Sequence, residues 1–479
     1  MATPGDRGTV ARWWPLAALI VLAAALRFPA LGAQSFWHDE VFTARLVDGN
    51  FSDLTDGIRH TESTPPLYYA IAWLADKVFG GGETGLRLAS ALFGTLLVPV
   101  AYAIGRELSS RRAGLIAAAL VAVSPYLLWY SQEARSYALY ALLSAASFLF
   151  FLRALERATP RTLAAWAVLS ALAIATHYFA GFIVGIEAVW LLVACGRSRA
   201  VLAAVGGVAA TCAVLAPLLL SQRSSGRVDW IEDTSLVTRA TDTAKRFISG
   251  QYGAPVNALT AAAAVLFLCA LVTLFVRAGE RERARATVAL AVALGSIAVP
   301  FVLAIGGFDY FYDHYVIAAL VPLLCVAAVG IAAAPGRWAL AGGAALCAVL
   351  ASVAIAQQLD EDLQREDWRE VSDLLGPPAG TRVIVADESA SKPLEYYLGA
   401  TPFEEGERAA GELALVETFR SGHTREPPPP DVPGFTLADD YEGPTYRLMT
   451  YRASAPVAVT PASVAPFGLD DEAFVLQQG

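Results

Sequence analysis

Eleven stretches of apolar residues, each close to the length that crosses a bilayer, constrain this chain more than any other feature. A helix needs about 20 apolar residues to span the hydrocarbon core. With 56% hydrophobic and 16% charged residues, the composition excludes a soluble globular protein, so we predict an all-α polytopic membrane protein. The stretches lie near residues 13–33, 84–105, 113–130, 136–153, 162–178, 180–196, 200–220, 257–276, 286–305, 315–334 and 337–356.

The distribution of arginine in the short connections predicts the orientation of these segments. If the N-terminus is cytoplasmic, 15 arginines fall in connections on the inner side, and most of the loop acids fall on the outer side. The sequence therefore predicts a multi-pass protein of the cell inner (plasma) membrane, with a cytoplasmic N-terminus and an extracytoplasmic C-terminal region. Its richness in Ala, Arg, Gly and Val is typical of a high-GC bacterium.

The region after residue 356 differs in composition from the transmembrane module predicted over residues 1–356. It holds 9 basic and 23 acidic residues, a net charge of −14 in a chain whose total is −9. This acidic balance argues against nucleic acid as a partner. A helix ending over Trp368–Leu375, a buried strand over Thr381–Asp387 and a helix over Lys392–Leu398 predict a small extracytoplasmic α/β domain at residues 357–452. Residues 453–479 are expected to be disordered.

An acidic pair, Asp39 and Glu40, follows the first apolar segment directly and lies beside Trp37. Carboxylates at the edge of a bilayer are costly, and they often mark functional sites. The same predicted outer loop later holds His60 and Glu62. We expect these four ionisable side chains to lie near the headgroup plane of the outer face.

Four motifs then occur in order along the chain, and together they resemble a known family. The family is that of the polyprenyl-phosphate-sugar-dependent glycosyltransferases (glycosyltransferase family 39 type), which includes the protein O-mannosyltransferases and the lipid A aminoarabinose transferases and has the GT-C membrane fold. The similarity covers about residues 13–335. The motifs are Trp37-x-Asp39-Glu40, Thr64-Pro-Pro-Leu-Tyr-Tyr69, Leu86-Arg-Leu-Ala-Ser-Ala-Leu-Phe-Gly94 and Ser124-Pro-Tyr-Leu-Leu-Trp-Tyr-Ser-Gln-Glu-Ala-Arg-Ser-Tyr-Ala138.

The resemblance implies an inverting transfer of a monosaccharide from a polyprenyl-phosphate carrier to an acceptor hydroxyl at the outer membrane face. The acceptor would be a glycan, a lipid or a protein, and membrane lipid surrounds the enzyme. In the family, the Asp of the first outer loop is the catalytic base, and Asp39 occupies that position here, with Glu40 beside it. A donor carried on a lipid suits this topology, because nucleotide sugars are absent outside the cell.

The leaving phosphate needs charge stabilisation more than it needs a proton. Two departures from the family bear on this step: His314-Tyr315 stands where relatives commonly have Arg-Tyr, and Tyr137 stands where many relatives have Asp. Lys245-Arg246, in a later outer loop, supplies further cations. The side chains that we expect to bind the substrates are Arg27, Trp37, His60, Glu62, Arg87, Glu133, Arg135, Tyr137, His177, Tyr178, His314 and Tyr315.

Several alternatives remain open from the sequence. Asp39, His60, Glu62 and Glu133 could ligate a divalent metal, but their spacing is not diagnostic, so we expect no metal site and no required cofactor. An oligosaccharide polymerase or ligase with a lipid-linked donor would differ from the predicted enzyme in what the lipid carries. A transporter would show ionisable residues near the midplane and two matching halves, and a scaffold protein would not need acids clustered beside Trp37.

Overall fold

The computed structural model describes residues 4–254, 257–419, 428–468 and 473–479. The chain forms two compact units. The membrane unit comprises Met1–Leu31 and Leu46–Ala356, and the C-terminal unit comprises Gly32–Arg45 and Gln357–Gly479. The expectation that residues 1–356 form one module is therefore wrong for Gly32–Arg45, because this segment packs with the end of the chain.

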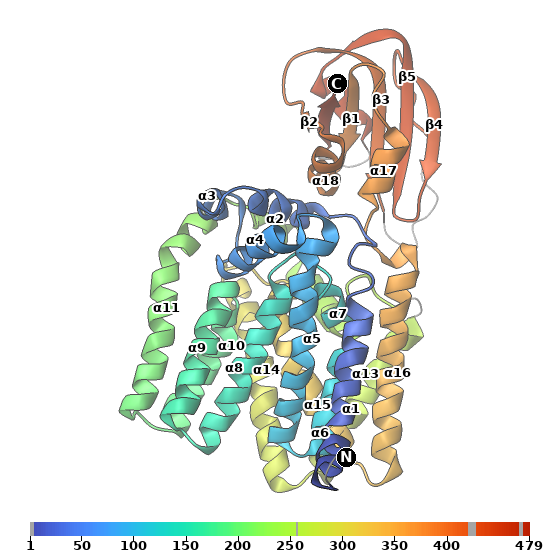
Figure 1. The fold of residues 1–479 in the computed structure, drawn as a ribbon. Helices are drawn as coiled ribbons and strands as arrows, with labels where there is room; N and C mark the ends of the chain where they lie inside the picture. The colour runs from blue at the N-terminus through green and yellow to red at the C-terminus, as the bar shows by residue number, and fades with distance from the viewer. Residues whose placement is uncertain (1–3, 255–256, 420–427, 469–472) are drawn as a thin grey trace. The chain divides into compact units, whose positions relative to one another are not determined.

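The membrane unit is a bundle of helices, and α3 and α4 lie across one end of it (Figure 1). Its helices are α1 (Pro4–Arg27), α3 (Phe51–Thr61), α4 (Leu67–Phe79), α5 (Glu83–Leu108), α6 (Arg111–Val123), α7 (Pro125–Tyr130), α8 (Tyr137–Glu156), α9 (Pro160–Thr176), α10 (Ala180–Ala194), α11 (Arg199–Arg223), η1 (Asp229–Asp233), α12 (Leu236–Ser249), α13 (Asn257–Arg277), α14 (Glu280–Ile305), η2 (His314–Ala319), α15 (Leu320–Ala333) and α16 (Arg337–Leu359).

Seven helices of the described chain are long and apolar enough to cross a membrane: α5, α8, α11, α13, α14, η2 with α15, and α16. Three shorter apolar helices cover Trp13–Arg27, Pro160–Thr176 and Ala180–Ala194. These ten helices correspond to ten of the eleven predicted stretches. The all-α polytopic fold is therefore confirmed.

The remaining stretch, residues 113–130, is not one helix, and this prediction is wrong. The chain turns at Ser124, whose ψ of 118° is extended, and α7 then begins at Pro125. Proline lacks an N–H group and disfavours the helical conformation in the residue before it, so α6 cannot continue through this point. The Ser124 hydroxyl accepts a hydrogen bond from the N–H of Leu127 and caps α7.

Burial separates the centre of the bundle from its surface. In η2 with α15, 83% of the most apolar window is buried, whereas the figure is 17% for α11 and for α13. The exposed residues of α11 and α13 include Val214, Leu220 and Val265. The buried α15 is therefore the core helix. The exposed side chains of α11 and α13 are apolar and stable in contact with lipid, so these two helices face the membrane.

The C-terminal unit is built on one six-stranded sheet with the strand order β2-β6-β1-β3-β5-β4. β1 and β3 are parallel, and the other neighbouring strands are antiparallel. Its elements are α2 (His38–Asp48), which begins in this unit, η3 (Glu361–Leu363), α17 (Trp368–Leu375), β1 (Arg382–Ala386), α18 (Glu388–Leu398), β2 (Thr401–Pro402), β3 (Arg408–Thr418), β4 (Thr436–Glu442), β5 (Tyr446–Val459), α19 (Pro461–Val464), η4 (Ala465–Phe467) and β6 (Phe474–Gln478).

Both faces of the sheet are covered, which explains why every residue of β1 is buried. On one face, Ile384 packs in a cluster with Trp368 of α17 and Leu394 of α18. On the other face, Val383 packs in a cluster with Val464 of α19. A strand that is buried on both sides has a continuous apolar sequence, and this is the pattern that predicted β1. The small α/β domain is confirmed.

The expectation that residues 453–479 are disordered is wrong for the part of this segment that the structure describes. β5 continues to Val459, and β6 lies between β2 and β1 in the sheet. Leu476 of β6 is 1% exposed in the apolar core. The polar residues around Leu476 give no strand pattern, so the sequence did not predict β6. One buried leucine and backbone pairing on both sides hold β6 in place.

Candidate active site

The acidic pair lies at the start of α2 in the C-terminal unit. Asp39 and Glu40 occupy the first turn, where the positive end of the helix dipole favours carboxylates. Glu40 is fully buried, and Asp39 is partly exposed. A carboxylate of Glu40 lies 3.8 Å from a guanidinium nitrogen of Arg365, which the sequence analysis did not single out. Only Asp39 of the two acids therefore has surface that a substrate could reach.

In the membrane unit, the structure brings two predicted residues together as a buried ion pair. Glu62 follows the end of α3, and Arg135 lies in the loop before α8. The Nη1 atom of Arg135 is 3.2 Å from both carboxylate oxygens of Glu62. Tyr69 donates a hydrogen bond to the same carboxylate, and burial raises the pKa of its phenol well above the ordinary value. A paired, hydrogen-bonded buried charge of this kind holds the loops before α4 and α8 in one arrangement.

Arg27, a predicted phosphate ligand, is fully buried and hydrogen-bonds within the protein. Its Nη atoms donate to the carbonyls of Ala122 at 3.0 Å and Val121 at 3.3 Å, in the last turn of α6. These carbonyls lack helical partners because α6 stops before Pro125. Arg27 thus stabilises the break between α6 and α7, and its guanidinium does not reach the surface in this structure.

Gly94, the last residue of the third motif, has a packing role beside Arg27. A Cβ atom at this position would lie 1.9 Å from the Ser131 hydroxyl and 3.0 Å from Arg27 Nε. Arg27 Nε donates to that hydroxyl at 3.2 Å. Any larger side chain would collide with this hydrogen bond, which explains a glycine here on steric grounds.

Four other predicted substrate-binding residues are dispersed. Arg87 is buried and donates to the carbonyl of Leu31 at 2.8 Å. Glu133 is buried and accepts a hydrogen bond of 3.0 Å from the indole N–H of Trp129. His60 is exposed at the end of α3, and Tyr178 donates to the Gln222 amide of α11 at 2.7 Å.

Four predicted residues do meet, in an aromatic cluster formed by Tyr137, His177, His314 and Tyr315. The ring centres of Tyr137 and His314 are 4.7 Å apart, as are those of His314 and Tyr315. His177 lies 5.2 Å from Tyr315 and 6.0 Å from Tyr137. Tyr140 of α8 stacks on His177 at 4.8 Å and 11°. We call these five residues the aromatic–histidine cluster.

The hydrogen bonds of His177 define its protonation state. Its Nδ1 accepts from the backbone N–H of Phe179 at 3.3 Å, so the proton of the neutral ring is on Nε2. Burial, together with the charges of His314 and Arg135, lowers the pKa of His177 to about 3. Within the described residues, Nε2 has no hydrogen-bond partner. His177 is therefore a neutral ring with one buried donor inside the cluster.

Asp313, which the sequence analysis did not select, adds a carboxylate next to the cluster. Tyr126 donates to it at 2.7 Å, and Arg246 lies 3.2 Å from its second oxygen. Burial acts to raise the pKa of Asp313, but His314, Arg246 and Tyr126 outweigh it and lower the pKa to about 2. The position of Asp313 directly before His314 was the available signal.

Comparison with known proteins identifies the fold. Residues 63–220 match the family model described as dolichyl-phosphate-mannose-protein mannosyltransferase. The structure is similar to the crystal structure of ArnT from Cupriavidus metallidurans in the apo state, with a TM-score of 0.57 and 13% sequence identity over 96% of this chain and 100% of that chain. The chain has the GT-C membrane fold of this structure.

The structure of Cupriavidus metallidurans ArnT bound to undecaprenyl phosphate is also similar to this chain. The TM-score is 0.53 and the identity 12%, over 95% of this chain and 99% of that chain. No curated protein sequence matches the chain. The family resemblance drawn from the four motifs is confirmed.

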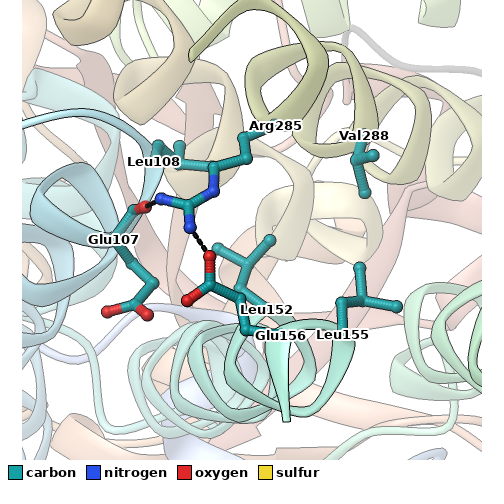
Figure 2. A pocket seen from close by; sticks show the side chains of 7 residues that line it. All are labelled: Glu107, Leu108, Leu152, Leu155, Glu156, Arg285 and Val288. Carbon is teal, nitrogen blue, oxygen red and sulfur yellow. Dashed lines mark hydrogen bonds and ion pairs between the residues drawn. The ribbon is translucent and has the colours of Figure 1, made fainter. Parts of the chain in front are cut away.

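Two cavities of the membrane unit differ in character. Figure 2 shows one of about 200 Å³, where Arg285 pairs with Glu156 and donates to the carbonyl of Glu107. Because α8 begins at Tyr137 and ends at Glu156, this cavity lies about 30 Å along the helix from the aromatic–histidine cluster. No predicted site residue is in its lining, so it is not the candidate active site.

The second cavity is an apolar groove of about 570 Å³ between α10 and α14. Added Cβ atoms at Gly181 and Gly185 would meet nothing within 4 Å, so these glycines leave the groove open. α10 begins three residues after His177, which places the start of the groove near the aromatic–histidine cluster. The lining residues are Gly181, Phe182, Gly185, Ile186, Val189, Trp190, Val193 and Val299.

The alternative metal site is not formed. Across the described parts of the chain, no group of three or more His, Cys, Asp or Glu side chains is arranged to hold a metal ion. In particular, Glu62 accepts from Arg135 and Glu133 accepts from Trp129 in place of a shared ion.

Proposed function

We propose that the protein is an inverting glycosyltransferase that moves a monosaccharide from a polyprenyl-phosphate carrier to an acceptor hydroxyl on the outer face of the bacterial inner membrane. The matched family model names a dolichyl-phosphate-sugar enzyme, and a similar structure is bound to undecaprenyl phosphate. These lipids share one chemistry, a phosphate on a long isoprenoid chain. The acceptor is a glycan, a lipid or a protein.

Asp39 is the general base of this reaction. The acceptor oxygen attacks the anomeric carbon, its proton passes to the Asp39 carboxylate, and the bond between the anomeric carbon and the phosphate oxygen breaks. The polyprenyl phosphate leaves with the bonding electrons, and the configuration at the anomeric carbon inverts. The observation that carries this role is that Asp39 is partly exposed at the helix start while Glu40 is buried.

The aromatic–histidine cluster and its neighbours bind the donor phosphate. His177 offers a buried Nε2–H donor, and Arg246 brings a cation to Asp313 directly before His314. A buried N–H group that already points into the site needs no reorganisation when negative charge develops on the leaving oxygen. It therefore stabilises the transition state efficiently. Arg27 does not take this role, because its donors serve the end of α6.

The isoprenoid tail of the donor occupies the groove of α10 and α14. The lining is apolar and the groove faces the membrane. A hydrocarbon chain can therefore enter the groove from the lipid phase, and no polar group has to lose its bound water. The nearness of the groove to His177 along α10 supports one donor site with a polar end and an apolar end.

The test of this proposal is the substitution Asp39→Asn. The amide keeps the shape of the side chain but cannot accept the proton, so kcat should fall by about 10²- to 10⁴-fold. Purified wild type and variant are incubated with a panel of undecaprenyl-phosphate-linked hexoses and pentoses and candidate acceptors, and release of undecaprenyl phosphate is measured.

Asp56→Asn is the matched control, because Asp56 is an exposed acid on the neighbouring α3. It should keep the wild-type rate. A well-folded Asp39→Asn protein with the wild-type rate would contradict the assignment of the base. A parallel assay uses lipid-linked oligosaccharides as donors, and turnover only with these would identify a polymerase or ligase instead.

A further inference from the structure

In the C-terminal unit, the chain after α16 runs alongside the segment that carries the acidic pair. Hydrogen bonds between side chains and backbone groups join the two segments. The Ser35 hydroxyl donates to the carbonyl of Glu366 at 3.0 Å and accepts from the N–H of Trp368 at 2.9 Å. Ser35 is fully buried between them. Two residues before Trp37, the chain is therefore held on both sides by the C-terminal segment.

Two arginines of this C-terminal segment extend the same contact. Arg369 donates from Nη2 to the carbonyls of Gly32 at 3.1 Å and Ala33 at 2.8 Å. The backbone N–H of Arg365 donates to the side-chain oxygen of Gln34 at 3.4 Å. Residues 32–35 thus have hydrogen bonds to residues 365–369 at every position, which fixes the path of the chain into α2.

The side chain of Arg365 reaches past this contact to the motif itself. Its guanidinium lies 5.2 Å from the centre of the Trp37 ring, within the range of a cation–π interaction. Its Nη1 lies 3.8 Å from the carboxylate of Glu40. The side chains of Arg365 and Glu40 are 5% and 0% exposed, so water screens their attraction weakly. Arg365 contacts the residues on both sides of the dipeptide His38-Asp39.

We propose that Arg365 is a positioning residue for glycosyl transfer. It holds Trp37 and Glu40 from opposite ends of the motif and so sets the direction in which the first turn of α2 presents Asp39. This inference rests on the proposed role of Asp39 as the base. It gives the C-terminal unit a part in the reaction, because Arg365 lies beyond the last membrane helix.

The expected effect of Arg365→Ala is on kcat rather than on donor affinity. Misplacing a catalytic group by about 1 Å costs on the order of 10²-fold in rate, so kcat should fall by about 10- to 100-fold. The KM for the donor should stay close to the wild-type value, since the proposed role of Arg365 is to orient Asp39 and not to bind the donor phosphate. Arg365→Lys keeps the charge near Glu40 but stacks less well on Trp37, so it should recover part of the rate.

The experiment uses the full-length protein in detergent. Wild type, Arg365→Ala, Arg365→Lys and Asp39→Asn are compared for kcat and KM with whichever undecaprenyl-phosphate-linked sugar the wild type turns over fastest, and for thermal unfolding. Arg452→Ala is the control. Arg452 is an exposed arginine of β5 in the same unit, so its truncation should not destabilise the sheet.

A loss of kcat in Arg365→Ala, with partial recovery in Arg365→Lys and the wild-type rate in Arg452→Ala, supports the inference. Wild-type kcat in Arg365→Ala while Asp39→Asn is inactive overturns the inference and leaves the proposed function standing. Equal loss in Arg365→Ala and Arg365→Lys, matched by equal lowering of the unfolding temperature, assigns a structural role only and also overturns it. An active Asp39→Asn overturns the proposed base and this inference together.

Discussion

The buried ionisable residues of the membrane unit differ in what they contact, and this decides what each can do. Arg27 donates to backbone carbonyls, and Arg135 pairs with Glu62. Both therefore stabilise the fold. Asp313 instead lies among His314, Arg246 and Tyr126, in contact with the aromatic–histidine cluster. At the residue scale, burial alone does not distinguish a charge that holds the fold together from one beside the aromatic–histidine cluster.

The lowered pKa of Asp313 predicts how stability depends on pH. Its folded-state pKa is about 2, below the ordinary value of 3.8. The stabilisation is therefore fully present above about pH 4 and is lost as the pH falls towards 2, with a total of about 2 kcal/mol. Thermal unfolding of wild type in detergent between pH 2 and 6 should show this loss.

Asp313→Asn cannot ionise, so its unfolding temperature should be lower than that of wild type above pH 4, and the difference should narrow towards pH 2. Asp56→Asn, which changes an exposed acid, should follow the wild-type curve. Parallel curves for wild type and Asp313→Asn over the whole range would show that the carboxylate contributes nothing through its ionisation.

At the scale of elements, small residues and breaks determine where side chains of the site can lie. Pro125 ends α6, the freed carbonyls bind Arg27, and Gly94 leaves room for the hydrogen bond between Arg27 and Ser131. The short helix α7 that follows carries Tyr126 to Asp313. Pro125, Gly94 and Tyr126 belong to the recognised motifs, so those motifs encode local shape as well as chemistry.

The groove between α10 and α14 gives the element-scale prediction. Gly185→Leu adds a side chain into open space, so the fold should be retained while the groove is filled. If the isoprenoid tail binds there, KM for undecaprenyl-phosphate-linked sugar should rise by roughly 10-fold, since each buried CH₂ group contributes about 0.8 kcal/mol. Steady-state kinetics over a range of donor concentrations measures this.

Gly206→Leu is the matched control, because Gly206 lies on the lipid-facing α11, has open space around it and is not part of the groove. Its kinetics should equal those of wild type. An unchanged KM in Gly185→Leu, with a normal unfolding temperature, would place the tail elsewhere.

At the scale of the whole molecule, the end of the chain completes the unit that carries the acidic pair. β6 pairs with β1 and β2, and Gly32–Arg45 belongs to the same compact unit. A substitution that destabilises this sheet should therefore reduce transferase activity as well as the stability of the unit, even if it lies far from Asp39 in the sequence.

Leu476→Ala tests this dependence. Leu476 is buried in the sheet core, and truncating a buried leucine costs about 2–5 kcal/mol. Phe474→Ala, in the same strand, removes a side chain that is 40% exposed and should cost much less. Limited proteolysis and transferase activity are measured together. Full activity in Leu476→Ala despite rapid cleavage of the C-terminal unit would show that the membrane unit acts alone.

Several features of this protein were determined by the sequence by itself. Apolar length predicted ten of the membrane helices, and continuous apolar residues predicted β1 between α17 and α18. The four motifs predicted the GT-C fold. These signals are local, because the length of an apolar run and the spacing of residues in a motif can be read without knowing what packs against them.

Only the tertiary structure decided which of the predicted residues share a site. In the structure, Arg27 donates to backbone carbonyls, and the rings of Tyr137, His177, His314 and Tyr315 lie in contact. Strand β6 is held in the sheet by pairing with β1 and β2. The tertiary structure also placed Arg365 against Trp37 and Glu40, more than 320 positions away. The physical reason is that a buried charge or a polar strand is stable only with its partners, and these partners come from distant parts of the chain.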